Sequence, residues 1–135
     1  MGIFNSRKHK LPKFPDGVIP LFKQLCAVLD ATAVAELRKA VQDALAEHRK
    51  QVGKERTFDL RGSEELAERC YFLLDHYQDF PPEKQALITG AVRYFSIAED
   101  PFDERIFSSG FHDDMKVMNY VLEEVGVEDR YLETI

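Results

Sequence analysis

The sequence predicts an all-α fold, a compact bundle of about five helices. Apolar residues recur every three or four positions through most of the chain, the spacing that places them on one face of a helix. No window of four to eight residues alternates convincingly between apolar and polar, and no Asn-Gly or Asp-Gly turn lies between β-branched runs. With 135 residues, the chain is long enough for one hydrophobic core.

The N-terminal part of the chain lacks this periodicity. Residues 1–17 are predicted to form a flexible basic arm ahead of a single helical domain that spans residues 18–135. The first helical segment covers residues 18–29, where Pro20 suits a first turn because its missing N–H would have no partner there. The apolar residues at helical spacing in this segment are Ile19, Phe22, Leu25, Cys26 and Leu29.

A second, longer helix is predicted to begin with Asp30 or Thr32 as its N-cap and to run to about Val52, before Gly53. Its apolar stripe consists of Val34, Leu37, Val41, Leu45, His48 and Val52. Because His48 lies on this stripe, we expect a half-buried histidine with a hydrogen-bond partner rather than a catalytic base.

Three further helices are predicted in the second half of the chain. One begins at Ser63, which is followed by two glutamates that suit the positive end of the helix dipole. The next follows the Pro81-Pro82 pair, and the last begins near His112 and ends at Gly126. The residues expected to face the core are Leu66, Cys70, Leu73, Leu74 and Tyr77, then Leu87, Ile88, Ala91, Val92 and Phe95, and finally Met115, Met118, Leu122 and Val125.

The formal net charge of −6 conceals a strong asymmetry. Residues 1–56 contain 11 Lys and Arg against 6 Asp and Glu, whereas residues 57–135 contain 7 against 18. The two regions could neutralise each other within one molecule. Alternatively, the acidic region could dock a protein partner, or the chain could self-associate. The acidic balance argues against nucleic acid as a partner.

Neither a transmembrane segment nor a secretory leader is expected, because no stretch approaches the roughly 18 apolar residues that a membrane helix needs. We therefore expect a cytoplasmic protein. Gly2 and the basic residues behind it fit a myristoylation pattern, although a mobile basic tail without membrane association is the simpler interpretation. Cys26 and Cys70 lie among apolar residues without zinc-ligand spacing, which favours buried free thiols, with a disulfide between them as the alternative.

Acidic residues are densest from Glu99 to Asp114, where six carboxylates lie within sixteen residues. Their repulsion must be relieved by a cation, by helix N-termini or by basic neighbours. In one interpretation, Asp113 or Asp114 complements the N-terminus of the last helix and the cluster is structural. In the other, the cluster binds a divalent cation. The predicted ligands are then Asp100, Glu104, Asp113 and Asp114, with His112 assisting a softer metal.

The same segment resembles the signature of the YkvA-like family, small bacterial helical domains of unknown function. That signature contains a tyrosine, an Asp-x-Ile-Pro-Asp element and a Gly-x-x-Asp-Asp element. The matching residues are Tyr94, Asp100, Phe102, Glu104, Gly110, Asp113 and Asp114, and the resemblance covers about residues 64–126. The chain departs from the family in having Ala98, Asp103 and Phe107 where prolines are usual, and Glu104 in place of the second aspartate. The resemblance implies a helical fold and a bacterial source, without a mechanism.

No nucleophile elbow, P-loop, HExxH motif or dinucleotide fingerprint is present in the sequence. We therefore predict a noncatalytic bacterial protein without a cofactor, acting as a protein-interaction or regulatory module through its acidic C-terminal half. A divalent-cation-binding protein that uses the acidic segment is the alternative.

Overall fold

A computed structural model describes residues 9–13, 17–52, 60–97 and 112–132, apart from the side chains of residues 51, 52 and 112. Over these ranges the chain contains five α-helices, one short 3₁₀ helix and no strand. This confirms the predicted all-α bundle. The elements are α1 (Val18–Leu25), α2 (Ala31–Val52), α3 (Leu60–Asp75), η2 (Tyr77–Asp79), α4 (Pro82–Ser96) and α5 (His112–Glu124).

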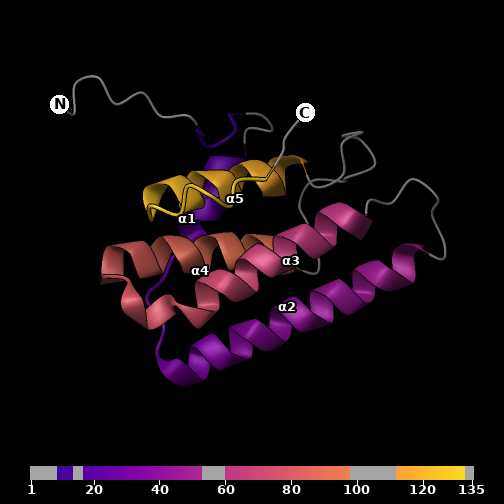
Figure 1. The fold of residues 1–135 in the computed structure, drawn as a ribbon, viewed down its shortest axis with the longest axis horizontal. Coiled ribbons are helices and arrows are strands. Elements are labelled where there is room, and N and C mark those ends of the chain that lie inside the picture. The colour runs from indigo at the N-terminus through magenta and orange to yellow at the C-terminus, as the bar shows by residue number, and fades with distance from the viewer. Residues whose placement is uncertain (1–8, 14–16, 53–59, 98–111, 133–135) are drawn as a thin grey trace.

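Helix α4 lies at the centre of the bundle and packs against α1, α2, α3 and α5. In Figure 1, α1 and α5 lie above α4 and α2 lies below it. A helix with neighbours on several sides buries more than one stripe. Four of the five α4 residues predicted to face the core are buried, namely Ile88, Ala91, Val92 and Phe95. The other buried residues of α4 are Gln85, Thr89, Gly90 and Tyr94.

Gly90 of α4 sets how closely α1 approaches. A Cβ atom built on Gly90 would lie 2.6 Å from Sγ of Cys26 and 2.8 Å from Cε1 of Phe22, distances that no real Cβ tolerates.

Helix α1 ends at Leu25, earlier than the predicted end at residue 29, and Cys26 has extended backbone angles. Both Cys26 and Cys70 are free thiols, so the disulfide alternative is wrong.

The segment between α1 and α2 is held by a buried hydroxyl network. The backbone N–H of Leu29 donates to the Tyr77 hydroxyl at 2.9 Å, and that hydroxyl lies 3.0 Å from Oγ1 of Thr89. Gln85 donates from Nε2 to the Tyr77 carbonyl at 3.0 Å. Because Tyr77 and Thr89 are almost fully buried, these bonds fix the segment against α4 rather than leaving it a loose loop.

Helices α2 and α3 lie side by side. Asp30 caps α2, because its Oδ1 accepts a hydrogen bond from the backbone N–H of Ala33 at 2.8 Å. Of the two predicted N-caps, Asp30 and Thr32, the first is therefore confirmed. Helix α3 begins at Leu60, so the predicted start at Ser63 is wrong. Ser63 is fully buried inside the first turn, and its hydroxyl contacts His48 of α2 instead of capping its own helix.

Among the described residues, two ion pairs join the basic N-terminal region to the acidic C-terminal region. Arg38 pairs with Asp75, and Arg49 with Glu64. All four side chains are at least 40% exposed, so each pair contributes little to stability. The pairs nevertheless show that part of the charge asymmetry is neutralised within one molecule.

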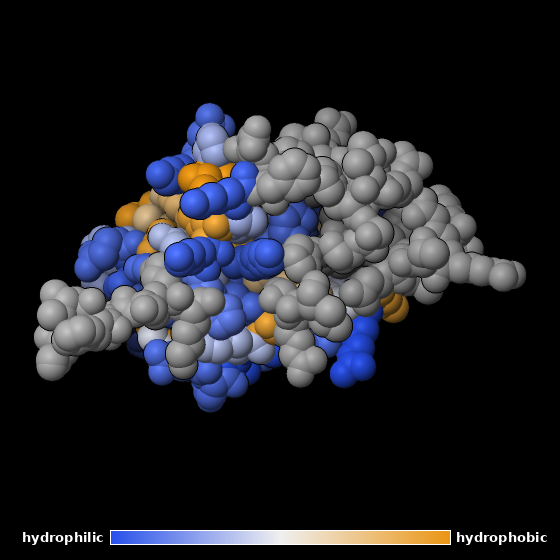
Figure 2. Space-filling view, turned by 90° about the horizontal axis from the view of Figure 1, so that it is seen from above, coloured by the Kyte–Doolittle hydropathy of each residue, from blue (hydrophilic) through white to orange (hydrophobic). Residues whose placement is uncertain are grey.

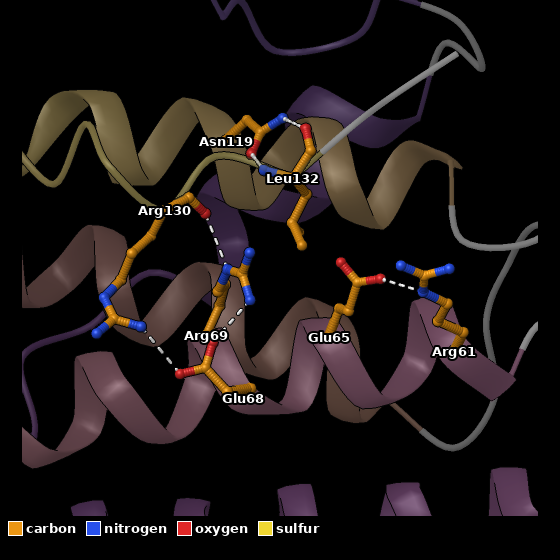
Figure 3. Close-up of polar contacts among 7 residues, drawn as sticks. All are labelled: Arg61, Glu65, Glu68, Arg69, Asn119, Arg130 and Leu132. Carbon is orange, nitrogen blue, oxygen red and sulfur yellow. Dashed lines mark hydrogen bonds and ion pairs between the residues drawn. The ribbon is translucent and has the colours of Figure 1, made fainter.

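The end of α5 and the segment that follows it are fixed by polar contacts. Gly126 has φ of 84°, and the N–H groups of Gly126 and Val127 donate to the carbonyls of Glu123 and Leu122, a Schellman motif that ends α5 as predicted. The buried side chain of Asn119 then exchanges two hydrogen bonds with the Leu132 backbone, at 2.7 and 2.8 Å (Figure 3). The C-terminal segment is thereby closed over the core.

The segment is also tied to α3. Nε of Arg69 donates to the carbonyl of Arg130 at 2.8 Å, and the Arg130 guanidinium pairs with Glu68 at 3.0 Å (Figure 3). That guanidinium also lies 3.9 Å from the ring centroid of Phe72.

Viewed from above, the described surface is mostly hydrophilic, with a hydrophobic patch toward one end (Figure 2).

Asn119→Ala should lower the free energy of unfolding by about 2 to 4 kcal/mol, because it leaves the buried N–H and carbonyl of Leu132 without their partners. Urea unfolding measures the loss. The matched control Gln42→Ala, at an exposed position of α2, should stay within about 0.5 kcal/mol of wild type. A loss below about 1 kcal/mol for Asn119→Ala would contradict the role given to these two bonds.

Candidate functional site

Of the predicted acidic cluster, Asp113 and Asp114 are described and occupy the first turn of α5. The Tyr94 hydroxyl donates to Oδ2 of Asp113 at 2.7 Å. Asp114 is only 4% exposed and lies close to Cys70. Burial raises the pKa of the Cys70 thiol, and the negative charge of the Asp114 carboxylate raises it further. Both carboxylates lie at the positive end of the helix dipole, where the structural interpretation places them.

The other predicted ligands are not described. Asp100 and Glu104 lie outside the described residues, as does the side chain of His112. Within the part of the chain that the structure describes, no three His, Cys, Asp or Glu side chains form a group that could hold a metal ion. Cation binding by the acidic segment therefore stays a prediction.

His48 and Ser63 form a close pair between α2 and α3. Nδ1 of His48 lies 2.6 Å from Oγ of Ser63, and the imidazole packs edge-on against Phe95. A serine beside a histidine suggests a nucleophile with its base. However, Ser63 is 0% exposed and no substrate could reach its hydroxyl. The pair is structural, and the prediction of a half-buried, hydrogen-bonded His48 is confirmed.

A groove opens on the surface where the end of α1, the α1–α2 segment, the first half of α2 and the end of α4 meet. Its volume is about 420 Å³, within the range of ordinary ligand and docking sites. Most of the side chains that line it are apolar. The lining residues are Leu25, Leu29, Ala33, Glu36, Leu37, Ala40, Arg93, Ser96 and Ile97.

Arg93 is the cation of this groove, and its surroundings differ from those of the other arginines. Its Nη1 donates to the carbonyl of Leu25 at 3.1 Å, which satisfies a backbone group left over at the end of α1. Five of the six described arginines form an ion pair with a carboxylate, and Arg93 is the exception. A guanidinium has five N–H donors, so Arg93 retains capacity for an anion.

The groove also has an anion and an apolar projection. Glu36 of α2 is exposed and forms no ion pair within the described part of the chain. Val28 is 55% exposed, the large hydrophobic residue most exposed among those described, and it lies between the groove residues Leu25 and Leu29. The groove therefore combines an apolar lining with one charge of each sign, and the exposed Val28 is the sequence neighbour of its lining residue Leu29.

Sequence reasoning did not find this groove, because its residues come from two stretches far apart in the chain, residues 25–40 and 93–97. Two signals pointed toward it. Val28 and Leu29 are apolar beyond the last turn of α1, and Arg93 interrupts the apolar run of α4. Neither signal identifies a site until the fold brings the two segments together.

No family model, curated protein or solved structure matches the chain. The resemblance to the YkvA-like family therefore stays a prediction. None of the helices in the described ranges is both long and apolar enough to cross a membrane.

Thermal melting in EDTA and then in Mg²⁺, Ca²⁺, Mn²⁺ or Zn²⁺ tests the predicted cation site. A cation at one hundred times its dissociation constant should stabilise the native state by about 2.7 kcal/mol, which is a readily measured rise in Tm. The rise should disappear in Asp113→Asn and in Asp100→Asn, but persist in Asp79→Asn, a control at an exposed carboxylate in η2. An unchanged Tm with all four cations would contradict cation binding.

The His48–Ser63 pair should make stability depend on pH. Burial holds the pKa of His48 below its ordinary value of 6.5, outweighing the nearby Glu47 carboxylate, which raises it. The unfolded state therefore binds a proton at His48 more readily than the folded state does. The contribution of neutral His48 to the free energy of unfolding is complete above pH 6.5, and it is lost as the pH falls through the lowered folded-state pKa.

Urea unfolding at a series of pH values should therefore show wild type losing stability from about pH 6.5 toward pH 5. His48→Gln keeps a hydrogen-bonding side chain without a titration in this range, so its stability should change less over the same interval. Identical pH dependence in the two proteins would contradict the lowered pKa of His48.

Proposed function

We propose that this protein is a noncatalytic, cytoplasmic protein-interaction module that docks a protein partner in the groove between α1, α2 and α4. The observation that carries the proposal is Arg93, which lies in an apolar groove without the carboxylate partner that every other described arginine has. A partly desolvated guanidinium without its anion is costly in free energy, and a docked partner that supplies a carboxylate would offset that cost.

The apolar lining supports a protein as the occupant. Docking surfaces for peptides and helices combine a hydrophobic centre with charged groups that fix the partner's orientation. In the groove, Leu25, Leu29 and Leu37 supply the apolar contact, while Glu36 and Arg93 supply one charge of each sign. A nucleic acid backbone would be attracted by Arg93 but repelled by Glu36.

This proposal moves the docking face away from the acidic C-terminal half that the composition suggested. Several carboxylates of that half already have partners within the chain. Glu64, Glu65, Glu68 and Asp75 each pair with an arginine. Each of these paired carboxylates offers less to a basic partner than its formal charge implies.

The experiment is affinity recovery of the tagged full chain from cells of its own source, with co-purifying proteins quantified by mass spectrometry. Val28→Asp places a charge next to the lining residue Leu29 in the sequence without disturbing the core, since Val28 is exposed. It should reduce recovery of the partner about tenfold or more, which corresponds to about 1.4 kcal/mol of binding free energy.

The matched control is Ala46→Asp, which adds the same charge at an exposed position of α2 outside the groove. It should leave recovery unchanged. Two results would refute the proposal: no protein recovered above the untagged background, or equal recovery by the two variants.

A further inference from the structure

The groove carries a second inference, which rests on the proposed function and names the partner. Glu36 and Arg93 line the same groove from different helices, with opposite charges and no ion pair to a described residue. In a two-fold symmetric interface, a residue that contacts a second residue across the axis is contacted by it in return. A surface that carries one cation and one anion can therefore pair with itself, forming the same ion pair twice.

An exposed apolar side chain lies close to the groove in the sequence. Val28 is 55% exposed, and its sequence neighbour Leu29 lies in the groove lining. The backbone N–H of Leu29 is bound by the buried Tyr77 hydroxyl, so the segment that carries Val28 is fixed. A segment that is already fixed needs little further ordering when a second copy docks.

We infer that the groove docks a second copy of this chain, forming a two-fold symmetric homodimer in which Glu36 of each copy pairs with Arg93 of the other. The charge pattern distinguishes this occupant from others. A fatty acid or another small carboxylate would satisfy Arg93 but would bring its negative charge toward Glu36. Only an occupant with both charges meets both residues, and a second copy of the chain carries both.

The test is the oligomeric state of the purified full chain, measured by sedimentation equilibrium. Wild type is expected to be a dimer. Glu36→Arg and Arg93→Glu each place like charges opposite one another at both contacts, so each should weaken dimerisation about tenfold or more, in the range that close charge pairs contribute at protein interfaces.

Mixing the two variants gives the decisive result. In a mixed dimer, the Glu36→Arg chain has two arginines and the Arg93→Glu chain has two glutamates, so both contacts again join opposite charges, one in the native sense and one with reversed sign. An equimolar mixture should therefore dimerise more tightly than either variant alone. Glu47→Arg, at an exposed position of α2 outside the groove, is the matched control and should dimerise like wild type.

Arg93→Glu also removes the hydrogen bond to the Leu25 carbonyl, so its folding is checked by circular dichroism. If it does not fold, Glu36→Arg decides the matter, because the Glu36 side chain is exposed and its replacement leaves the core intact. A monomeric wild type, a dimer that persists in Glu36→Arg, or folded variants whose mixture stays monomeric would each overturn the homodimer. If the homodimer is overturned, affinity recovery still tests the proposed protein-binding function. A different protein that is recovered with wild type but not with Val28→Asp would support that function.

Discussion

The contact of α1 with Gly90 of α4 is the constraint on which the described surface depends. A side chain at residue 90 would displace Cys26 and Phe22, so glycine lets the end of α1 lie directly against the central helix. Once α1 is seated there, its last carbonyl, that of Leu25, comes within reach of Arg93 one turn further along α4. The chain must then cross from α1 to α2 over the surface of α4, and the groove is the space left beside that crossing.

Buried polar groups fix this arrangement more specifically than apolar packing could. The Tyr77 hydroxyl holds Leu29, and Thr89 and Gln85 of α4 hold Tyr77. A network of this kind is costly if half satisfied, which favours the one arrangement in which all its members meet. Asn119 of α5 has the same effect, because it closes the C-terminal segment over the core. The floor and edge of the groove are therefore held by contacts that do not depend on an occupant.

The helices could be predicted from the sequence because they are local. The three-to-four residue spacing identified α2 and α4, and Gly126 marked the end of α5 through its positive φ. The errors arose where a distant residue decided the outcome. Helix α1 stops at Leu25 because the following segment is bound by Tyr77, and Ser63 lies inside α3 because its hydroxyl is used by His48. No periodicity reports either contact.

The candidate sites divide in the same way. Asp113 and Asp114 were conspicuous as a sequence cluster, yet Asp113 accepts a hydrogen bond from Tyr94 and Asp114 is buried beside Cys70. The groove gave almost no sequence signal, because Glu36 and Arg93 come to line one groove only after α2 packs against α4. Arg93 differs from the other described arginines in forming no ion pair with a carboxylate. This difference can be seen only in the folded structure.

The central claim is that two copies of the chain associate through the groove. Methyl NMR spectra of the wild-type chain, recorded over a range of protein concentrations, test this most directly. The account predicts that the methyl signals of Val28, Leu29 and Ile97 shift as the concentration rises, whereas those of the fully buried Leu73 and Leu122 do not. Groove signals that stay constant, or shifts confined to another face of the bundle, would contradict it.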